Sequence, residues 1–119
     1  MRQLLDTSLL IKLLHEGKSI EGGISAITLI EVLRGVPENK RPDVKKALEE
    51  VCGVIGIDND VILEYCKLYD TLRRSGRMIA DADLIIAASA KARRLILKTL
   101  DKDFRTLEDL GVNVGVEEN

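Results

Sequence analysis

The sequence predicts an α/β protein, built as a three-layer α/β/α sandwich on a central parallel sheet. Short apolar runs typical of strands alternate along the chain with segments whose apolar residues recur every three or four positions. A helical segment separates every pair of consecutive strands, and crossovers of this kind join parallel strands. The length of 119 residues, with 45% hydrophobic and 32% charged residues, suits a compact domain. We therefore expect one domain over residues 1–119.

A strand and a helix open the chain. Gln3-Leu4-Leu5 is a short apolar run that ends at Asp6. Leucines then recur at the spacing of one helix face, which predicts a helix that extends to about Glu16. The leucines on this face are Leu9, Leu10, Leu13 and Leu14.

The next segment is expected to contain a very short strand and two helices. Gly22-Gly23 breaks the chain before a strand over 24–26, and a helix follows over 27–34. Gly35 ends this helix, and Pro42 suits the first turn of the next one. The apolar stripe of that third helix consists of Val44, Ala47, Leu48 and Val51.

The second half of the chain continues the alternation. A strand over 54–57 is followed by Asp58, which is suited to cap a long helix ending near Ser75-Gly76. The segment 81–92 is apolar nearly all round, as in a buried helix, and 95–97 is expected to be a central strand. A short helix over 104–110 and a strand over 112–116 complete the pattern. We expect the inward face of the long helix to carry Ile62, Tyr65, Cys66 and Tyr69.

Composition excludes several classes of protein. The chain has two Tyr, one Phe and no Trp, which argues against a platform of aromatic rings that stacks single-stranded bases. The one histidine, His15, argues against a multi-histidine metal site. Cys52 and Cys66 are not spaced as a zinc site or a disulfide framework, so we expect both to be small core residues. The net charge of -2 does not indicate nucleic-acid binding, but it leaves local basic patches open.

The sequence shows no sign of a membrane segment. No apolar run approaches the roughly 18 residues that a membrane span needs. An acid stands at Asp6, where a signal peptide would have its apolar stretch. We therefore expect a cytoplasmic protein with no membrane partner.

Four acids stand where a solvent-exposed face does not explain them. Asp6 closes the first strand, Glu31 is embedded in an apolar helix, and Asp83 begins the buried helix. Asp101 follows the strand over 95–97. Ligands of open parallel sheets bind beyond the carboxyl ends of the strands, where Asp6 and Asp101 fall. If the helices bring the other two acids to the same place, four carboxylates share one pocket.

Such a pocket predicts a bound divalent metal. Like charges at close range push some carboxylates to protonate unless a cation neutralises them. Ligation by oxygen alone points to Mg²⁺ or Mn²⁺, and these ions suit the hydrolysis of a phosphodiester.

Each acid also has a purely structural interpretation, and these alternatives stay open. Thr28-x-x-Glu31 fits a capping box, and Asp81 is suited to be an N-cap. Asp83 in a first helical turn complements the helix dipole. Asp6 and Asp103 are each placed to cap the helix that follows them.

At these residues the sequence resembles the PIN-domain ribonucleases, and most closely the VapC-type toxins of prokaryotic toxin-antitoxin pairs. Four blocks carry the resemblance in the family's order, and together they span nearly the whole chain. They are Leu5-Asp6-Thr7-Ser8, the segment 25–35 around Glu31, the segment 81–90 that begins Asp81-Ala82-Asp83, and Thr99-Leu100-Asp101-Lys102-Asp103-Phe104.

The resemblance implies a PIN-like fold and a Mg²⁺- or Mn²⁺-dependent endoribonuclease that hydrolyses RNA phosphodiesters. The acids that match the family's metal ligands are Asp6, Glu31, Asp83 and Asp101, with Asp103 as an alternative or additional fourth ligand. Thr99 matches a hydroxyl that supports the fourth acid, and Thr7 or Ser8 a polar residue beside the first. The sequence departs from the family in that Ser89 stands where a threonine is common and the segment between Glu31 and Asp83 is short.

The resemblance also implies partners: an RNA substrate, an antitoxin whose C-terminal segment occupies the acidic groove, and a second copy of the chain in a homodimer. Basic residues on two segments are candidates for RNA contact because phosphate contacts position a strand. They are Arg34, Lys40, Arg41, Lys45 and Lys46 on one side, and Arg73, Arg74 and Arg77 before the third block.

Three other functions remain open on sequence grounds. A housekeeping RNA-processing nuclease and an inactive scaffold share the same fold. A phosphoacceptor receiver domain also has an acidic pocket on a parallel sheet, and Asp58 would then be the phosphorylated residue. Receiver domains usually have two adjacent acids after the first strand, whereas Thr7 follows Asp6 here.

Overall fold

The computed structural model, which describes residues 1–118, contains a five-stranded sheet in the order β3-β2-β1-β4-β5. All neighbouring strands are parallel, which confirms the α/β class. β1 is the middle strand, and β4 is an interior strand that pairs with β1 and β5, which confirms the expectation of a central strand at 95–97. The strands are β1 (Gln3–Leu5), β2 (Gly23–Ser25), β3 (Gly53–Ile55), β4 (Ile96–Thr99) and β5 (Val114–Val116).

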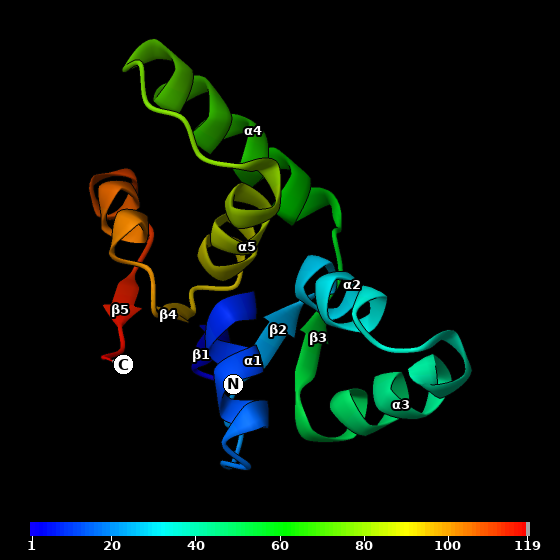
Figure 1. Ribbon diagram of the computed structural model, residues 1–119. Helices are drawn as coiled ribbons and strands as arrows, with labels where there is room; N and C mark the ends of the chain where they lie inside the picture. Colours follow the sequence, from blue (N-terminus) through cyan, green and yellow to red (C-terminus); the bar gives the residue numbers. More distant parts are fainter. Residues whose placement is uncertain (119) are drawn as a thin grey trace.

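The helices lie at the expected places between the strands. In Figure 1, α4 and α5 lie side by side, and a 3₁₀ segment, η2, lies next to β5. The helices are α1 (Thr7–His15), α2 (Ala26–Arg34), α3 (Arg41–Val51), α4 (Asn59–Arg74) and α5 (Asp81–Ala92), with 3₁₀ segments η1 (Glu38–Lys40) and η2 (Lys102–Leu110). None of the helices in residues 1–118 is long and apolar enough to cross a membrane.

Two separate apolar clusters make the fold a three-layer sandwich. Consecutive strand residues point to opposite faces of a sheet, and in β1 Leu4 joins one cluster while Leu5 joins the other. The Leu4 cluster lies under α4, α5 and η2, whereas the Leu5 cluster lies under α1, α2 and α3. Helices therefore cover both faces, as the sequence predicts.

The buried face of α4 differs from the expectation. Ile62 and Tyr69 are 46% and 43% exposed, and Cys66 is exposed too, whereas the residues packed inward are Val61, Leu68 and Leu72. Tyr65 lies between the buried face and the exposed face of α4 and is partly buried. Apolar residues surround much of this helix, so helical spacing alone leaves its rotation undetermined. The buried face is turned by about one residue from the expected one.

The two cysteines have different environments. Cys52 is 3% exposed in the Leu5 cluster, and burial raises the pKa of its thiol, so its prediction as a core residue is confirmed. Cys66 lies on the exposed face of α4, so the prediction for that residue was wrong.

A helix expected over 104–110 is a 3₁₀ segment that begins earlier, at Lys102. Phe104 and Leu107, three residues apart, are both buried, and residues at that spacing eclipse one another in a 3₁₀ helix. Gly111 closes the segment in the left-handed conformation, at φ 90°. This geometry turns the carboxylates that follow β4 toward α5.

The strand order places a topological switch point between β1 and β4. The chain moves from β1 through β2 to β3 on one side of β1, then crosses back to β4 and β5 on the other. Ligands of open parallel sheets bind beyond the carboxyl ends of such a strand pair. Asp6 and Asp101 follow these two strands, as the sequence predicts.

Candidate active site

Asp6 is a buried carboxylate at the end of the middle strand. Its side chain is 4% exposed and accepts hydrogen bonds from the backbone N–H of Leu9, at 2.9 Å, and from the hydroxyls of Ser8 and Thr99. The bond from Leu9 makes Asp6 the N-cap of α1. Asp6 therefore has the capping role considered for it, and it stands at the carboxyl end of β1, at the switch point.

Thr99 connects the ends of β1 and β4. Its hydroxyl donates to Asp6 Oδ2 and accepts from the backbone N–H of Asp101, at 2.9 Å. Asp101 Oδ1 in turn accepts from the backbone N–H of Asp103, at 2.8 Å, and so caps η2. The expectation that Asp103 caps this helix was wrong, because the helix begins earlier and Asp101 occupies the cap.

Glu31 on α2 is held by a hydroxyl from α1. Thr7 donates to Glu31 Oε1 at 2.7 Å, and the Thr7 and Thr28 hydroxyl oxygens lie 3.0 Å apart. Ser25 is the N-cap of α2, so Thr28 lies inside the helix and the capping-box interpretation of Glu31 was wrong. Arg34 lies 3.7 Å from Glu31 Oε2. Glu31 therefore does not take part in capping α2.

Asp83 lies in the first turn of α5 and carries the electrostatic signature of a crowded acidic site. Burial raises the pKa of its carboxyl, and the negative charges of Asp6, Glu31 and Asp101 raise it further. The influence of all three acids on one carboxyl means that α1, α2, α5 and the end of β4 bring their carboxylates together.

Asp81 does not have the capping role expected from the sequence. Ala80 occupies the N-cap position of α5, and Asp81 follows it as the first helical residue. The Asp81 carboxylate accepts a hydrogen bond of 2.6 Å from the Tyr65 hydroxyl, and this bond raises the pKa of Tyr65 to about 12. Asp81 is thus engaged with α4, while Asp83, two residues on, faces the acids.

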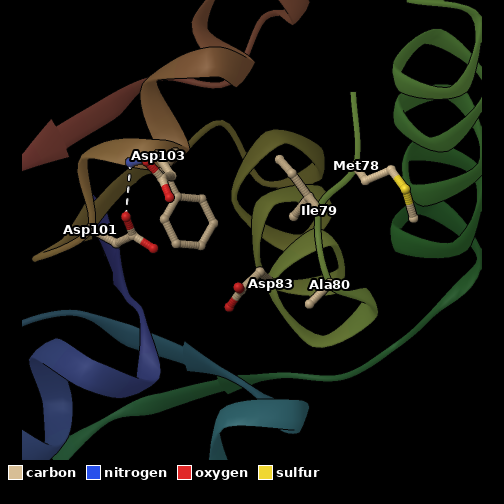
Figure 2. Close-up of a pocket in the computed structure, with 7 residues that line it drawn as sticks. Met78, Ile79, Ala80, Asp83, Asp101 and Asp103 are labelled. Carbon is tan, nitrogen blue, oxygen red and sulfur yellow. Dashed lines mark hydrogen bonds between the residues drawn. The ribbon is translucent and has the colours of Figure 1, made fainter. Parts of the chain in front are cut away.

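A cavity of about 160 Å³ opens beside these carboxylates. Figure 2 shows Asp101 and Asp103 on one side of it and Asp83, on α5, across from them. Met78, Ile79 and Ala80 from the loop before α5 form an apolar wall, and Phe104 also lines the cavity. The sequence analysis missed this wall, because nothing in the residues of the loop indicates that it returns to the acids.

The donor set suits a hard divalent cation that keeps part of its water shell. Within residues 1–118 no three His, Cys, Asp or Glu side chains are arranged to hold a metal ion directly. Mg²⁺ is commonly bound through one or two carboxylates, with waters completing its octahedron. Burial and, after it, the negative charges of Asp6, Glu31 and Asp101 raise the pKa of Asp83, and a bound cation would oppose this shift by favouring the ionised carboxylate. The residues therefore fit a hydrated Mg²⁺ or Mn²⁺ ion.

Several basic residues considered for RNA contact have structural partners instead. The Arg77 guanidinium donates to the carbonyl and hydroxyl of Thr106, at 2.7 and 3.0 Å, and approaches Asp109 at 3.3 Å. Arg41 donates to main-chain carbonyls at the end of α2, and Lys45 pairs with Glu49. Arg77 therefore ties the loop before α5 to η2, so it fixes both walls of the acidic cavity.

Asp58 lies away from the acidic site. It follows β3, which is an edge strand, whereas the four acids surround the ends of β1 and β4. As expected, Asp58 caps α4, and it also forms an ion pair with Arg93. The backbone N–H of Val61 and the Arg93 guanidinium lower the pKa of Asp58. These contacts account for Asp58 structurally and remove the basis of the receiver interpretation.

The fold and the site together define an α/β protein with carboxylates gathered at the switch point of its sheet. The family model of the PIN domain matches residues 4–110, and the chain belongs to this family. It is 35% identical over 115 residues to Ribonuclease VapC1 of Methanocaldococcus jannaschii, an alignment that covers 93% of this chain and 85% of that protein.

Solved structures have the same fold. The structure of VapBC-1 from nontypeable Haemophilus influenzae gives a TM-score of 0.80 at 24% identity, and the match covers 98% of each chain. VapBC-5 from Mycobacterium tuberculosis, a member of the VapBC family of toxin-antitoxin systems, gives a TM-score of 0.72 at 28% identity. That match covers 99% of this chain and 98% of the other. The PIN-like fold expected from the resemblance is confirmed.

Proposed function

We propose that this chain is a VapC-type endoribonuclease that hydrolyses RNA phosphodiesters with Mg²⁺ or Mn²⁺ and is the toxin of a toxin-antitoxin pair. The observation that carries the proposal is that Asp83 and Asp101 line one cavity while the Thr99 hydroxyl joins Asp6 to the backbone N–H of Asp101, and the charges of Asp6, Glu31 and Asp101 all raise the pKa of Asp83. The 35% identity to a ribonuclease of the same family supports RNA as the substrate. The proposal treats residues 1–119 as one nuclease domain, acting in the cytoplasm where its substrate is found.

Asp6, Glu31, Asp83 and Asp101 are the residues that we expect to hold the metal. When bound, the ion supplies positive charge that offsets these carboxylates and polarises the phosphodiester. Asp103 lines the same cavity as Asp83 and Asp101, which supports a contact of its carboxylate with the hydrated ion. Its role stays an alternative or an addition to that of Asp101.

The hydroxyls around the acids keep the carboxylates in position. Thr99 and Ser8 direct their hydrogen bonds to Asp6, and Thr7 directs its hydrogen bond to Glu31. Two acids that would otherwise rotate are therefore held toward the switch point before a ligand arrives. Such preorganisation lowers the reorganisation needed when a charged substrate binds.

Two protein partners belong to this proposal. The similar structure from Mycobacterium tuberculosis is a member of a toxin-antitoxin family, which supports an antitoxin as a partner here. A second copy of the chain in a homodimer is the other partner that we propose. Because the substrate and the catalytic acids are shared by housekeeping nucleases, the toxin role needs its own test in cells.

The experiment that tests the proposed activity is cleavage of a mixed RNA pool by the purified chain. Reactions contain Mn²⁺, Mg²⁺ or EDTA, and Asp6→Asn serves as the inactive variant. We expect cleavage that requires both the metal and Asp6. Undiminished cleavage by Asp6→Asn or in EDTA would contradict the proposal. Induced expression in bacteria then separates the roles, because only a toxin is expected to arrest growth and only with Asp6 intact.

A further inference from the structure

A second, larger cavity adjoins the acidic one. The last turns of α4 and the loop over 75–80, which runs back along α4 in Figure 1, enclose a volume of about 470 Å³. Met78 and Ile79 line both cavities, so the two are neighbours across this loop. The other side chains that matter here are Tyr69, Leu72, Arg73 and Arg77. This volume falls in the range of about 300–1,000 Å³ that small-molecule sites occupy.

Two of the apolar side chains that line this cavity, Met78 and Tyr69, are exposed to solvent, and packing within the fold does not account for their exposure. Met78 is 95% exposed, the highest fraction among the large apolar residues of the described chain. Figure 2 shows its side chain pointing away from Asp83 and Asp101. Tyr69 is 43% exposed although its ring stacks on that of Tyr65, with centroids 6.1 Å apart. The Met78 thioether and the edge of the Tyr69 ring are thus accessible to a ligand in the cavity that adjoins the acidic site.

The two arginines of this cavity differ in what they bind. Arg77 is engaged with Thr106 and Asp109, so its guanidinium is fixed by the fold. Arg73 is exposed and forms no ion pair with any of residues 1–118. Its positive charge is therefore available to an anion at the mouth of this cavity, which shares Met78 and Ile79 with the acidic cavity proposed to receive a phosphodiester.

We propose that this cavity is a nucleotide subsite, which takes the base of a nucleotide adjacent to the scissile phosphate while Arg73 binds a neighbouring phosphate. The proposal rests on the ribonuclease activity proposed above. RNA-binding proteins read single-stranded bases by stacking them on aromatic rings and guanidinium planes. Tyr69, Met78 and the Arg77 guanidinium are the surfaces on which a single base would pack, a contact that does not need a platform of several aromatic rings. Continuity with the acidic cavity and the positive charge favour RNA over an apolar protein segment.

The test compares RNA cleavage by the wild-type chain, Arg73→Gln, Tyr69→Ala and Met78→Ala, with sequencing of the cleaved ends of a mixed RNA pool. Lys67→Gln is the matched control, because Lys67 is exposed on the same helix and does not line the cavity. Both Arg73→Gln and Lys67→Gln remove one positive charge from α4. Thermal unfolding of each variant identifies any that fail to fold.

We expect Arg73→Gln to raise KM about 3- to 10-fold with kcat within about 2-fold, and to reduce the slope of log affinity against log salt by about 0.7. Lys67→Gln should leave KM, kcat and this slope unchanged. Tyr69→Ala and Met78→Ala should weaken the base preference at one position beside the cut. A change at one position of the substrate is a readout that loss of stability alone does not produce.

The outcomes separate this proposal from the activity on which it rests. If Asp6→Asn abolishes cleavage but Arg73→Gln, Tyr69→Ala and Met78→Ala match Lys67→Gln, the subsite is overturned and the nuclease stands. If the same variants change the molar mass measured by light scattering and leave base preference intact, the cavity is a protein interface and the subsite is again overturned. Undiminished cleavage by Asp6→Asn counts against the nuclease itself.

Discussion

The hydroxyl of Thr99 donates a hydrogen bond to the carboxylate of Asp6, although 93 positions separate the two residues in the chain. The bond crosses from β4 to the end of β1, and it links two of the acids because the same hydroxyl accepts from the backbone N–H of Asp101. Thr99 is fully buried, so these bonds have no competition from water. Thr99 thus fixes the position of Asp6 relative to the backbone of Asp101.

Replacing Thr99 with Val should impair the site more than the fold. The variant keeps the volume and branching but leaves Asp6 and the Asp101 amide without their shared partner. We expect a loss of about 1–3 kcal/mol in the free energy of unfolding, as for other buried polar groups left unsatisfied, and a fall in kcat of about 10-fold or more. Thr99→Ser retains the hydroxyl and should recover most of the activity. Equal activity of Thr99→Val and Thr99→Ser would show that the hydroxyl does not position Asp6.

Because the pKa of Asp83 is raised, we expect an unusual pH dependence of stability in metal-free buffer. Because burial and three negative charges raise its pKa in the folded state, the folded protein holds a proton there that the unfolded chain releases. The contribution of Asp83 to stability is therefore fully present below the ordinary pKa of an aspartate and is lost as pH rises through the higher folded-state pKa. Asp83→Asn should unfold at a higher temperature than the wild-type chain at pH 7 in EDTA. Differential scanning calorimetry between pH 4 and about pH 8 measures both curves. A lower melting temperature for Asp83→Asn would contradict the crowded site.

We expect the contacts of Arg77 to stabilise the loop before α5 against η2. Arg77→Gln removes the bonds to Thr106 and the ion pair with Asp109, so the free energy of unfolding should fall by about 1–3 kcal/mol. Amide hydrogens over 75–80 should exchange faster in this variant, as followed by mass spectrometry. Arg105→Gln is the control, since Arg105 pairs only with Glu108 on the same exposed segment. Unchanged exchange over 75–80 would mean that Arg77 does not hold this wall.

We expect the hydrogen bond from Tyr65 to Asp81 to be insensitive to pH. The hydrogen bond to Asp81 raises the pKa of Tyr65 to about 12, so the phenol stays protonated and keeps donating through the neutral range. Tyr65→Phe should lower the free energy of unfolding by about 0.5–1.5 kcal/mol, with the same difference at about pH 6 and at about pH 10, where an ordinary phenol is half ionised. Chemical denaturation at the two pH values measures it. A difference that shrinks at about pH 10 would contradict a raised pKa for the Tyr65 phenol.

Most of the fold follows from the spacing of apolar residues, with exceptions that have physical causes. The strand and helix alternation predicts the parallel sheet and its two covered faces. The rotation of α4 could not be predicted, because Ile62 and Val61 are both apolar and only packing against α5 decides which is buried. The 3₁₀ form of η2 is likewise a consequence of how Phe104 and Leu107 fit the core.

The candidate acids were predictable, whereas their surroundings were not. Asp6 and Asp101 follow strands, and Asp83 and Glu31 are acids inside apolar segments, so the sequence alone singles them out. From the sequence, a role for Thr7 and Thr99 beside the acids follows only from the resemblance to the family. The structure shows the hydrogen bonds by which these two hydroxyls orient the carboxylates. The wall formed by Met78 and Ile79 depends on the path of a loop, which no local pattern specifies.

The measurement that tests the central claim most directly is Mn²⁺ binding, followed by electron paramagnetic resonance of the free ion. Wild-type chain is compared with Asp6→Asn, Asp83→Asn and the control Asp70→Asn, whose parent residue is an exposed acid on α4. The account predicts that Asp6→Asn and Asp83→Asn each weaken Mn²⁺ binding by about 10-fold or more while Asp70→Asn binds as the wild-type chain does. Equal Mn²⁺ affinity in all four proteins would contradict a single metal site built from these acids.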